Sequence, residues 1–183
     1  ALLESRSGLR LELRRVADID TKRDRGVDLP PGVLTADAGA VVSDSGVDIV
    51  VELIGGVDAA RKAIIGAIEL GKPVVTANKA LLAHHGQALA EQAESAGLSL
   101  RFEAAVAGGI PVIKALTEGL AGNRMKRVMG VMNGTCNYIL TRMQAENLPY
   151  EAVFEEARQL GYLEADPNLD VGGIDAGHKL SIL

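Results

Sequence analysis

Apolar positions in the first hundred residues alternate between the periods of buried strands and of helices. Residues 47–53 are apolar or β-branched at nearly every position, which predicts a strand covered on both faces. Residues 57–70 repeat apolar positions at helical spacing, and 73–77 form a second short strand. A helix over 80–96 and a strand over 98–102 follow. This alternation predicts an α/β fold, a Rossmann-type parallel sheet whose ligands lie at the carboxyl ends of the strands.

The first twenty residues predict the second half of a nucleotide-binding βαβ unit. Residues 1–8 read as the last turn of a helix, and the alternating segment 9–13 leads to Asp18 at the end of a strand. An acidic residue at this place receives the ribose hydroxyls of a bound nucleotide, although Asp18 could equally be a turn residue. We expect the first strand and the glycine-rich turn of the unit to be missing from this chain.

The pattern changes after residue 102, which predicts a domain boundary. We expect a nucleotide-binding domain over 1–102, incomplete at its N-terminal side, and a smaller α+β domain over 103–183, incomplete at its C-terminal side. The elements predicted for the second domain are a helix over 111–121, a strand over 126–132, and helices over 136–146 and 150–160.

Composition narrows the classes of partner. The net charge of −5 is spread along the chain, so no basic stripe indicates nucleic acid and no polybasic segment indicates a membrane surface. Aromatic residues make up only 3% and Trp is absent, which disfavours base stacking. Cys136 is the only cysteine, and no long apolar run or signal peptide is present. We therefore expect a cytoplasmic protein.

The segment GYLEADPNLDVGGIDAGHK, residues 161–179, concentrates carboxylates and glycines and contains little that could form a core. If Asp175 opens a helix, Lys179 projects from the same face one turn later. A carboxylate and an amine that share one environment are suited to proton transfer. His178 adjoins Lys179 but would point about 100° away on a helix, which favours a structural role. His84 and His85 lack ligand partners at metal-site spacing and are read as surface or packing groups.

Three further stretches carry candidate residues, each with a plain structural alternative. Lys79 follows a strand at the expected cofactor edge, but a lysine there is commonly a solvated surface charge. The carboxylate of Glu103 could converge with carbonyl oxygens of the following segment, if extended, on a hard cation; a tight crossover without an ion is the alternative. Residues 133–135 could meet a small polar ligand at a helix N-terminus or simply cap the helix.

Five blocks occur in order and at natural spacing: VELIGG, PVVTANKALLA, FEAAVAGGIPVIKAL, GVMNGTCNYILTRM and GYLEADPNLDVGGIDAGHKLSIL. In these blocks, which cover nearly all of residues 40–183, the chain resembles the homoserine dehydrogenase family. The resemblance implies an oxidoreductase that interconverts L-homoserine and L-aspartate 4-semialdehyde with NAD or NADP, in the pathway to threonine and methionine. It also implies a homodimer or higher homo-oligomer, assembled through the catalytic domain.

The resemblance further implies roles for single residues. Lys179 matches the proton donor and acceptor at the C4 oxygen, and Asp175 matches its partner. Lys79 matches a lysine near both nicotinamide and substrate, and Glu164 matches the residue that holds the substrate amino group. The other implied contacts are Asp170, Asn133, Gly134 and Thr135 for substrate, Ile54, Gly55 and Gly161 for cofactor, and Glu103 with the carbonyls of Val106, Gly108 and Ile110 for a structural sodium ion. Asp18 is predicted as a cofactor contact from its place at the end of a strand.

Two questions stay open at this stage. The first is cofactor choice, because Asp18 and Asp20 favour the free 2′-hydroxyl of NAD, whereas the basic residues at 22, 23 and 25 could bind the 2′-phosphate of NADP. The second is the activity itself. Another two-domain nicotinamide enzyme, such as a dihydrodipicolinate-type reductase or a sugar dehydrogenase, and a non-catalytic nucleotide-binding module are the alternatives.

Overall fold

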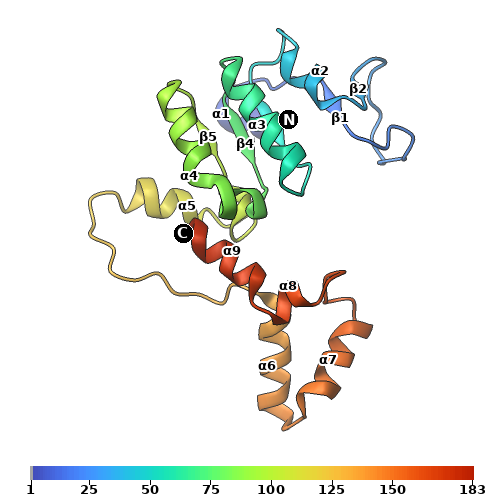
Figure 1. The fold of residues 1–183 in the computed structure, drawn as a ribbon, viewed down its shortest axis with the longest axis vertical. Helices are drawn as coiled ribbons and strands as arrows, with labels where there is room; N and C mark the ends of the chain where they lie inside the picture. The colour runs from blue at the N-terminus through green and yellow to red at the C-terminus, as the bar shows by residue number, and fades with distance from the viewer. Residues whose placement is uncertain (1) are drawn as a thin grey trace. The chain divides into compact units, whose positions relative to one another are not determined.

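The computed structural model describes residues 2–183, and the chain folds into two compact units (Figure 1). The first unit holds the chain up to Asn78 together with Gln87–Arg101, and the second holds Lys79–Gly86 together with Phe102–Leu183. Helix α4 (Lys79–Ser95) therefore begins in the second unit and continues in the first. No helix within residues 2–183 combines the length and the apolar composition needed to cross a membrane.

The first unit is built on parallel strands, which confirms the predicted α/β class. Strands β3 (Val50–Glu52), β4 (Val74–Thr76) and β5 (Leu100–Arg101) form one sheet in that order. Strands β1 (Val16–Ala17) and β2 (Leu34–Thr35) pair as a second, two-stranded parallel sheet. The register of the larger sheet places Glu52 beside Thr76, so their side chains lie on the same face.

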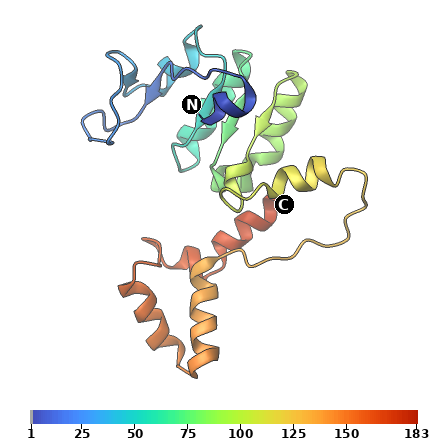
Figure 2. The ribbon, with the colours of Figure 1, turned by 180° about the vertical axis from the view of Figure 1, so that it is seen from behind.

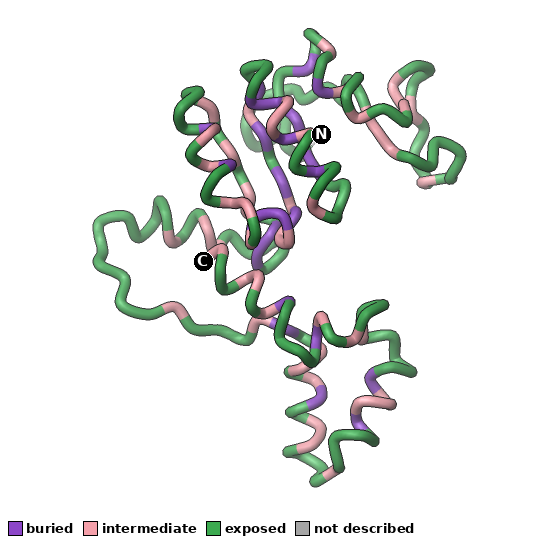
Figure 3. The backbone as a smooth tube through the Cα atoms, in the orientation of Figure 1, coloured by how far each residue is buried: buried purple, intermediate pink, exposed green. Residues whose placement is uncertain are grey.

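The core of this unit lies between one face of the larger sheet and helix α3 (Asp58–Glu69). Ile64 and Ala67 of α3 are fully buried, as is Val74 of β4, and Figure 3 shows this buried centre. Helix α2 (Ala38–Ser43) packs on α3 and buries Val42. The amine of Lys72 donates hydrogen bonds to the carbonyl oxygens of Val42 (2.7 Å) and Asp44 (2.5 Å), which satisfies carbonyl groups at the end of α2.

The opposite face of the larger sheet is open, which corrects the expectation of strands buried on both faces. Val51 is 59% exposed and Val75 is 37% exposed, whereas their neighbours in the strands are buried. Helix α1 (Leu2–Ser7) lies on this side of the sheet in Figures 1 and 2 but buries none of its residues. The apolar side chains on one face of β3 are therefore not covered by other parts of residues 2–183.

The alternating segment 9–13 does not form the predicted strand. Leu9, Leu11 and Leu13 are each more than 60% exposed, and pairing begins only at Val16. A strand needs a neighbour for its backbone groups, and β2 pairs only with Val16 and Ala17. The predicted helix end is confirmed, because α1 stops at Ser7 and Gly8 takes a φ of 70°.

The second unit consists of helices joined by turns and one long loop. Its helix α6 (Gly134–Glu146) and helix α7 (Tyr150–Gln159) pack as a hairpin around Ile139, Val153 and Ala157. The other elements are the 3₁₀ turn η1 (Glu103–Ala105), α5 (Val112–Lys114) with the π-helical stretch η2 (Ala115–Gly119), α8 (Asn168–Val171) and α9 (Ile174–Ile182).

The strand predicted over 126–132 is absent, and the described part of this unit contains no strand at all. The segment is extended but unpaired, and Met129 and Val131 are more than 70% exposed. Its β-type pattern is real, yet a strand forms only where a second strand supplies hydrogen-bond partners. The α+β character expected for residues 103–183 is therefore not seen within the described residues.

Candidate active site

Helix α9 carries the pair that the sequence singled out. Gly173, at a φ of 76°, precedes the helix, Asp175 lies in its first turn and Lys179 follows one turn later. The Lys179 amine donates hydrogen bonds to Asp175 Oδ2 (2.7 Å) and to the carbonyl oxygen of Met132 (2.6 Å). An ammonium group has three N–H donors, so among the described residues one donor of Lys179 is left for a ligand.

A second lysine shares the same carboxylate. Lys79, the first residue of α4, places its amine against Asp175 Oδ1. The same amine lies 3.9 Å from Glu164 Oε1, beyond hydrogen-bond distance. The Glu164 side chain is 48% exposed, whereas that of Asp175 is only 4% exposed. The structure therefore brings Lys79, Asp175 and Lys179 together, with the Glu164 carboxylate at the accessible edge.

Asp175 is held ionised at this site. Burial acts to raise its pKa, but hydrogen bonds from Lys179, Lys79 and Asn133 outweigh burial and lower the pKa from 3.8 to about 2. The carboxylate is thus a permanent anion at neutral pH, and it orients two cations toward one point.

Three of the predicted substrate contacts make hydrogen bonds within the protein. Asn133 is buried, donates from Nδ2 to both Asp170 and Asp175, and accepts from the Cys136 amide at the start of α6. Asp170 is 2% exposed, and the Thr135 hydroxyl donates to the Tyr162 carbonyl oxygen at 2.7 Å. The capping interpretation of Asn133 is thereby confirmed, and direct substrate contact by Asp170 and by residues 133–135 stays a prediction.

The predicted cofactor edge of the first unit rests on a buried hydrogen-bond network that the sequence reasoning missed. Glu52 is 2% exposed, and its two carboxylate oxygens accept from the Ile54 amide (2.7 Å) and the Thr76 hydroxyl (2.6 Å). Asn78 donates from its amide to Thr76 Oγ1 (3.0 Å) and from Nδ2 to the Gly56 carbonyl oxygen (2.7 Å). This network fixes the turn after β3. A polar residue at the same register in two otherwise apolar strands was the available signal.

The turn after β3 has the backbone that close approach of a ligand requires. Gly55 and Gly56 take φ values of 79° and 65°, which residues other than glycine rarely adopt. A Cβ atom at either glycine would meet open space, so the surface above the turn is accessible. Gly161, the other glycine predicted to contact the cofactor, ends α7 in the second unit with a φ of 73°.

Asp18 follows β1 and is paired with a cation. The Arg25 guanidinium lies 2.6 Å from Asp18 Oδ2, and the Asp20 amide donates to Oδ1 at 2.9 Å. The hydrogen bond from Asp20 and the contact with Arg25 lower the pKa of Asp18 below its ordinary value. An acid and a base thus lie side by side where the sequence predicts the ribose of a nucleotide.

The segment predicted to bind sodium is not the extended chain that was expected. Glu103 begins the 3₁₀ turn η1, and Ala107 and Gly108 take φ values of 58° and 57°, so the backbone reverses instead of alternating. Both Glu103 oxygens accept amide hydrogen bonds at 2.9 Å, from Ile113 and Lys114. No three His, Cys, Asp or Glu side chains cluster as metal ligands within residues 2–183. An ion here would depend on carbonyl oxygens.

His178 faces a second histidine. Its ring packs edge to face on His84, with ring centroids 5.3 Å apart.

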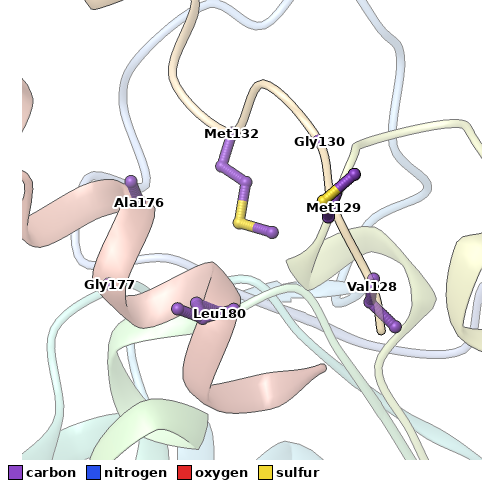
Figure 4. A pocket seen from close by; sticks show the side chains of 7 residues that line it. All are labelled: Val128, Met129, Gly130, Met132, Ala176, Gly177 and Leu180. Atoms are coloured by element: carbon purple, nitrogen blue, oxygen red, sulfur yellow. The ribbon is translucent and has the colours of Figure 1, made fainter. Parts of the chain in front are cut away.

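A groove of about 420 Å³ lies on another part of α9 and is lined by Val128, Met129, Gly130, Met132, Ala176, Gly177 and Leu180 (Figure 4). The extended segment and α9 form its two sides. Its lining is apolar and includes neither lysine of the site, so the groove is not where proton transfer would occur.

Comparison with known proteins identifies the family. Residues 1–103 match the family model for the NAD-binding domain of homoserine dehydrogenase, and residues 111–183 match the homoserine dehydrogenase model. The chain belongs to the homoserine dehydrogenase family. The resemblance noted in the sequence is thereby confirmed.

Relatives and solved structures agree with this assignment. A homoserine dehydrogenase from Mycobacterium bovis is 51% identical over 99% of this chain, which spans 41% of that protein. A crystal structure from Thiobacillus denitrificans aligns with a TM-score of 0.77 at 51% identity, over 81% of this chain and 35% of the other. A hyperthermophilic archaeal homoserine dehydrogenase in complex with NADPH aligns with a TM-score of 0.74 at 34% identity, over 82% and 46%. The chain thus spans about two fifths of the length of the curated relatives it matches.

The lowered pKa of Asp175 predicts a specific acid sensitivity. Because the folded-state pKa of about 2 lies below the ordinary 3.8, Asp175 contributes stability above about pH 4 that is lost as the pH falls toward 2. We expect D175N to be less stable than the wild-type protein near neutral pH. Between about pH 4 and pH 2, its free energy of unfolding should fall by on the order of 2 kcal/mol less than that of the wild-type protein. Urea unfolding at several pH values measures this. An equal acid loss in both proteins would contradict it.

Proposed function

We propose that the protein carrying this chain interconverts L-homoserine and L-aspartate 4-semialdehyde with NAD or NADP, as a step toward threonine and methionine. The observation that supports this most directly is the pair of lysine amines on one buried carboxylate, with the accessible Glu164 beside them. The family assignment supports the same reaction. The site thus combines ammonium groups with an accessible carboxylate, and these charges are complementary to the amino and hydroxyl groups of a small amino alcohol.

The residues divide the chemistry between them. Glu164 binds the ammonium group of homoserine, because its exposed carboxylate is the acceptor at the accessible edge of the site. In the oxidation direction Lys179 acts as the neutral amine: its two N–H groups stay on the Met132 carbonyl oxygen and Asp175 Oδ2, and its lone pair takes the proton of the C4 hydroxyl. In the reduction direction the ammonium form returns that proton to the C4 oxygen through its third N–H. Asp175 keeps both amines in place, and Lys79 adds positive charge beside the developing alkoxide. The nicotinamide, when bound, supplies the hydride acceptor.

Replacing Lys179 tests this assignment. We expect K179A in the full-length protein to lower kcat for homoserine oxidation by about 10²-fold or more, with a modest change in KM, as for loss of one general acid–base group. Steady-state kinetics measure the effect. K62A, at an exposed lysine of α3, is the matched control and should match the wild-type protein.

Two results would count against the proposal. Near-normal turnover by K179A would remove Lys179 from proton transfer. The assignment of homoserine as substrate would be contradicted if the wild-type protein did not turn over homoserine but did turn over a dihydrodipicolinate-type or sugar substrate.

We further propose that the Asp18–Arg25 pair sets the choice between NAD and NADP. The carboxylate suits a free 2′-hydroxyl and the guanidinium suits a 2′-phosphate, and each weakens the action of the other while they are paired. The archaeal neighbour in complex with NADPH shows that a family member binds the phosphorylated cofactor.

The two members of the pair should therefore act in opposite directions. We expect R25A to shift the ratio of kcat/KM for NADP over NAD downward by about 10-fold and D18N to shift it upward, since each removes one group that reads the 2′ position. E12A, at an exposed acid outside this loop, serves as control. A shift of both variants in the same direction would contradict the proposal.

We also propose that Glu103, with the carbonyl oxygens of Val106, Gly108 and Ile110, holds a structural sodium ion. Four hard oxygens occur in one short reversing loop, although the Glu103 carboxylate also caps α5 and the Ile110 carbonyl accepts from Val112. Glutamine at 103 would keep one acceptor oxygen but lose the charge.

Thermal unfolding in sodium chloride and in choline chloride tests the ion. An ion bound only by the folded protein raises Tm with its concentration, so wild-type Tm should rise in sodium and E103Q should respond less. E118Q, on the neighbouring η2, is the control. Equal Tm values of the wild-type protein in the two salts would rule the ion out.

Two broader proposals concern the whole protein. We propose a homodimer or higher homo-oligomer, supported by the exposed apolar side chains of the unpaired segment that holds Met129 and Val131. Light scattering at micromolar concentration would show a monomer if this is incorrect.

We propose a cytoplasmic location because the chain carries one unpaired cysteine, Cys136. Cell fractionation tests that location.

A further inference from the structure

The Asn133 side chain joins two buried carboxylates of the site, those of Asp170 and Asp175. Its Nδ2 group donates to Asp170 Oδ1 at 2.9 Å and to Asp175 Oδ2 at 3.0 Å, so both protons of one amide go to two carboxylates. Its Oδ1 accepts from the Cys136 amide at 2.7 Å. The orientation of the amide follows from these partners, because a flipped group would point oxygen at two anions and nitrogen at an N–H donor.

Each carboxylate that Asn133 contacts leads to a different functional group. Asp175 holds the amines of Lys179 and Lys79. Asp170 accepts from the Glu164 backbone amide at 3.0 Å through its other oxygen, and so fixes the start of the loop that presents the Glu164 side chain. The two carboxylates are 2% and 4% exposed and have the same charge. Without a shared donor between them they would repel in a medium that screens charge poorly.

We propose that Asn133 is a positioning residue that sets the distance between the proton-transfer amine of Lys179 and the amino-group ligand Glu164. It does so by clamping Asp175 and Asp170 to a single amide, and it does not itself contact the substrate. This rests on the proposed function of the site. It also explains why a substrate of one length fits. The hydrogen bonds from Asn133 to Asp170 and Asp175 determine how far apart the amino and hydroxyl groups of the substrate must be.

Serine at position 133 separates this role from helix capping. Serine is a good N-cap residue, so N133S should retain the start of α6 while it removes the amide that reaches both carboxylates. Aspartate keeps the shape and the cap oxygen but replaces the donor with a third negative charge. N137S is the matched control, because Asn137 is exposed on the next turn of α6.

The experiment measures homoserine kinetics and the Asp175 titration in the full-length protein. We expect kcat/KM for homoserine to fall by about 10²-fold in N133S, as for a misplaced reacting group, and further in N133D, with the KM for cofactor unchanged. Loss of a hydrogen bond to the ionised form should raise the pKa of Asp175 in N133S above its value in the wild-type protein. Carboxyl ¹³C NMR should show the same shift without reference to activity.

The outcomes separate this inference from the proposed function. If the wild-type protein does not oxidise homoserine but N133S still raises the pKa of Asp175, the proposed function is contradicted and the proposed role of Asn133 in positioning Asp175 is supported. If the wild-type protein is active and N133S leaves both the Asp175 titration and the homoserine kinetics unchanged, the clamp is overturned. Equal losses in N133S and N137S would also overturn it, since they would indicate general loosening of α6.

Discussion

The second unit depends on one buried carboxylate that two amines share. Asp175 is almost fully covered and stays ionised, because Lys179 and Asn133 donate hydrogen bonds to it and Lys79 forms an ion pair with it. An anion in such a place is costly unless it is paired and hydrogen-bonded. The same pairing that stabilises the buried carboxylate also orients the amines of Lys179 and Lys79, so the contact that constrains folding is the one on which the proposed chemistry depends.

A second buried carboxylate, that of Glu52, organises the first unit through hydrogen bonds. Glu52 accepts from a backbone amide and the Thr76 hydroxyl, and Asn78 continues the network to the turn at Gly56. Hydrogen bonds here replace the counter-ion, and they fix the glycine turn at the carboxyl end of β3. Ligands of parallel sheets lie at this edge. The first unit thus uses buried polar groups to hold the backbone rigidly at this edge of the sheet.

Several features were predictable because they depend on local periodicity. The helices at α3, α4, α6 and α7 and the parallel strands β3 to β5 follow apolar spacing that neighbouring residues alone specify. The strand predicted to lead from residue 9 to Asp18 forms only at Val16–Ala17, and the strand predicted over 126–132 is absent, for a related reason. Their alternation describes which side chains could face a core, but a strand exists only where another segment supplies hydrogen-bond partners.

The amino-acid sequence alone determined the family blocks, the helical phase that puts Asp175 and Lys179 on one face of α9, and the glycines that end α1 and α7. Only the tertiary structure decided that Lys79, far away along the chain, reaches the same carboxylate, that Asn133 joins Asp170 to Asp175, and that Arg25 pairs with Asp18. The physical reason is the range of the forces involved. Helical phase is set within a few residues, whereas an ion pair between distant residues requires the chain to bring them within about 3–4 Å.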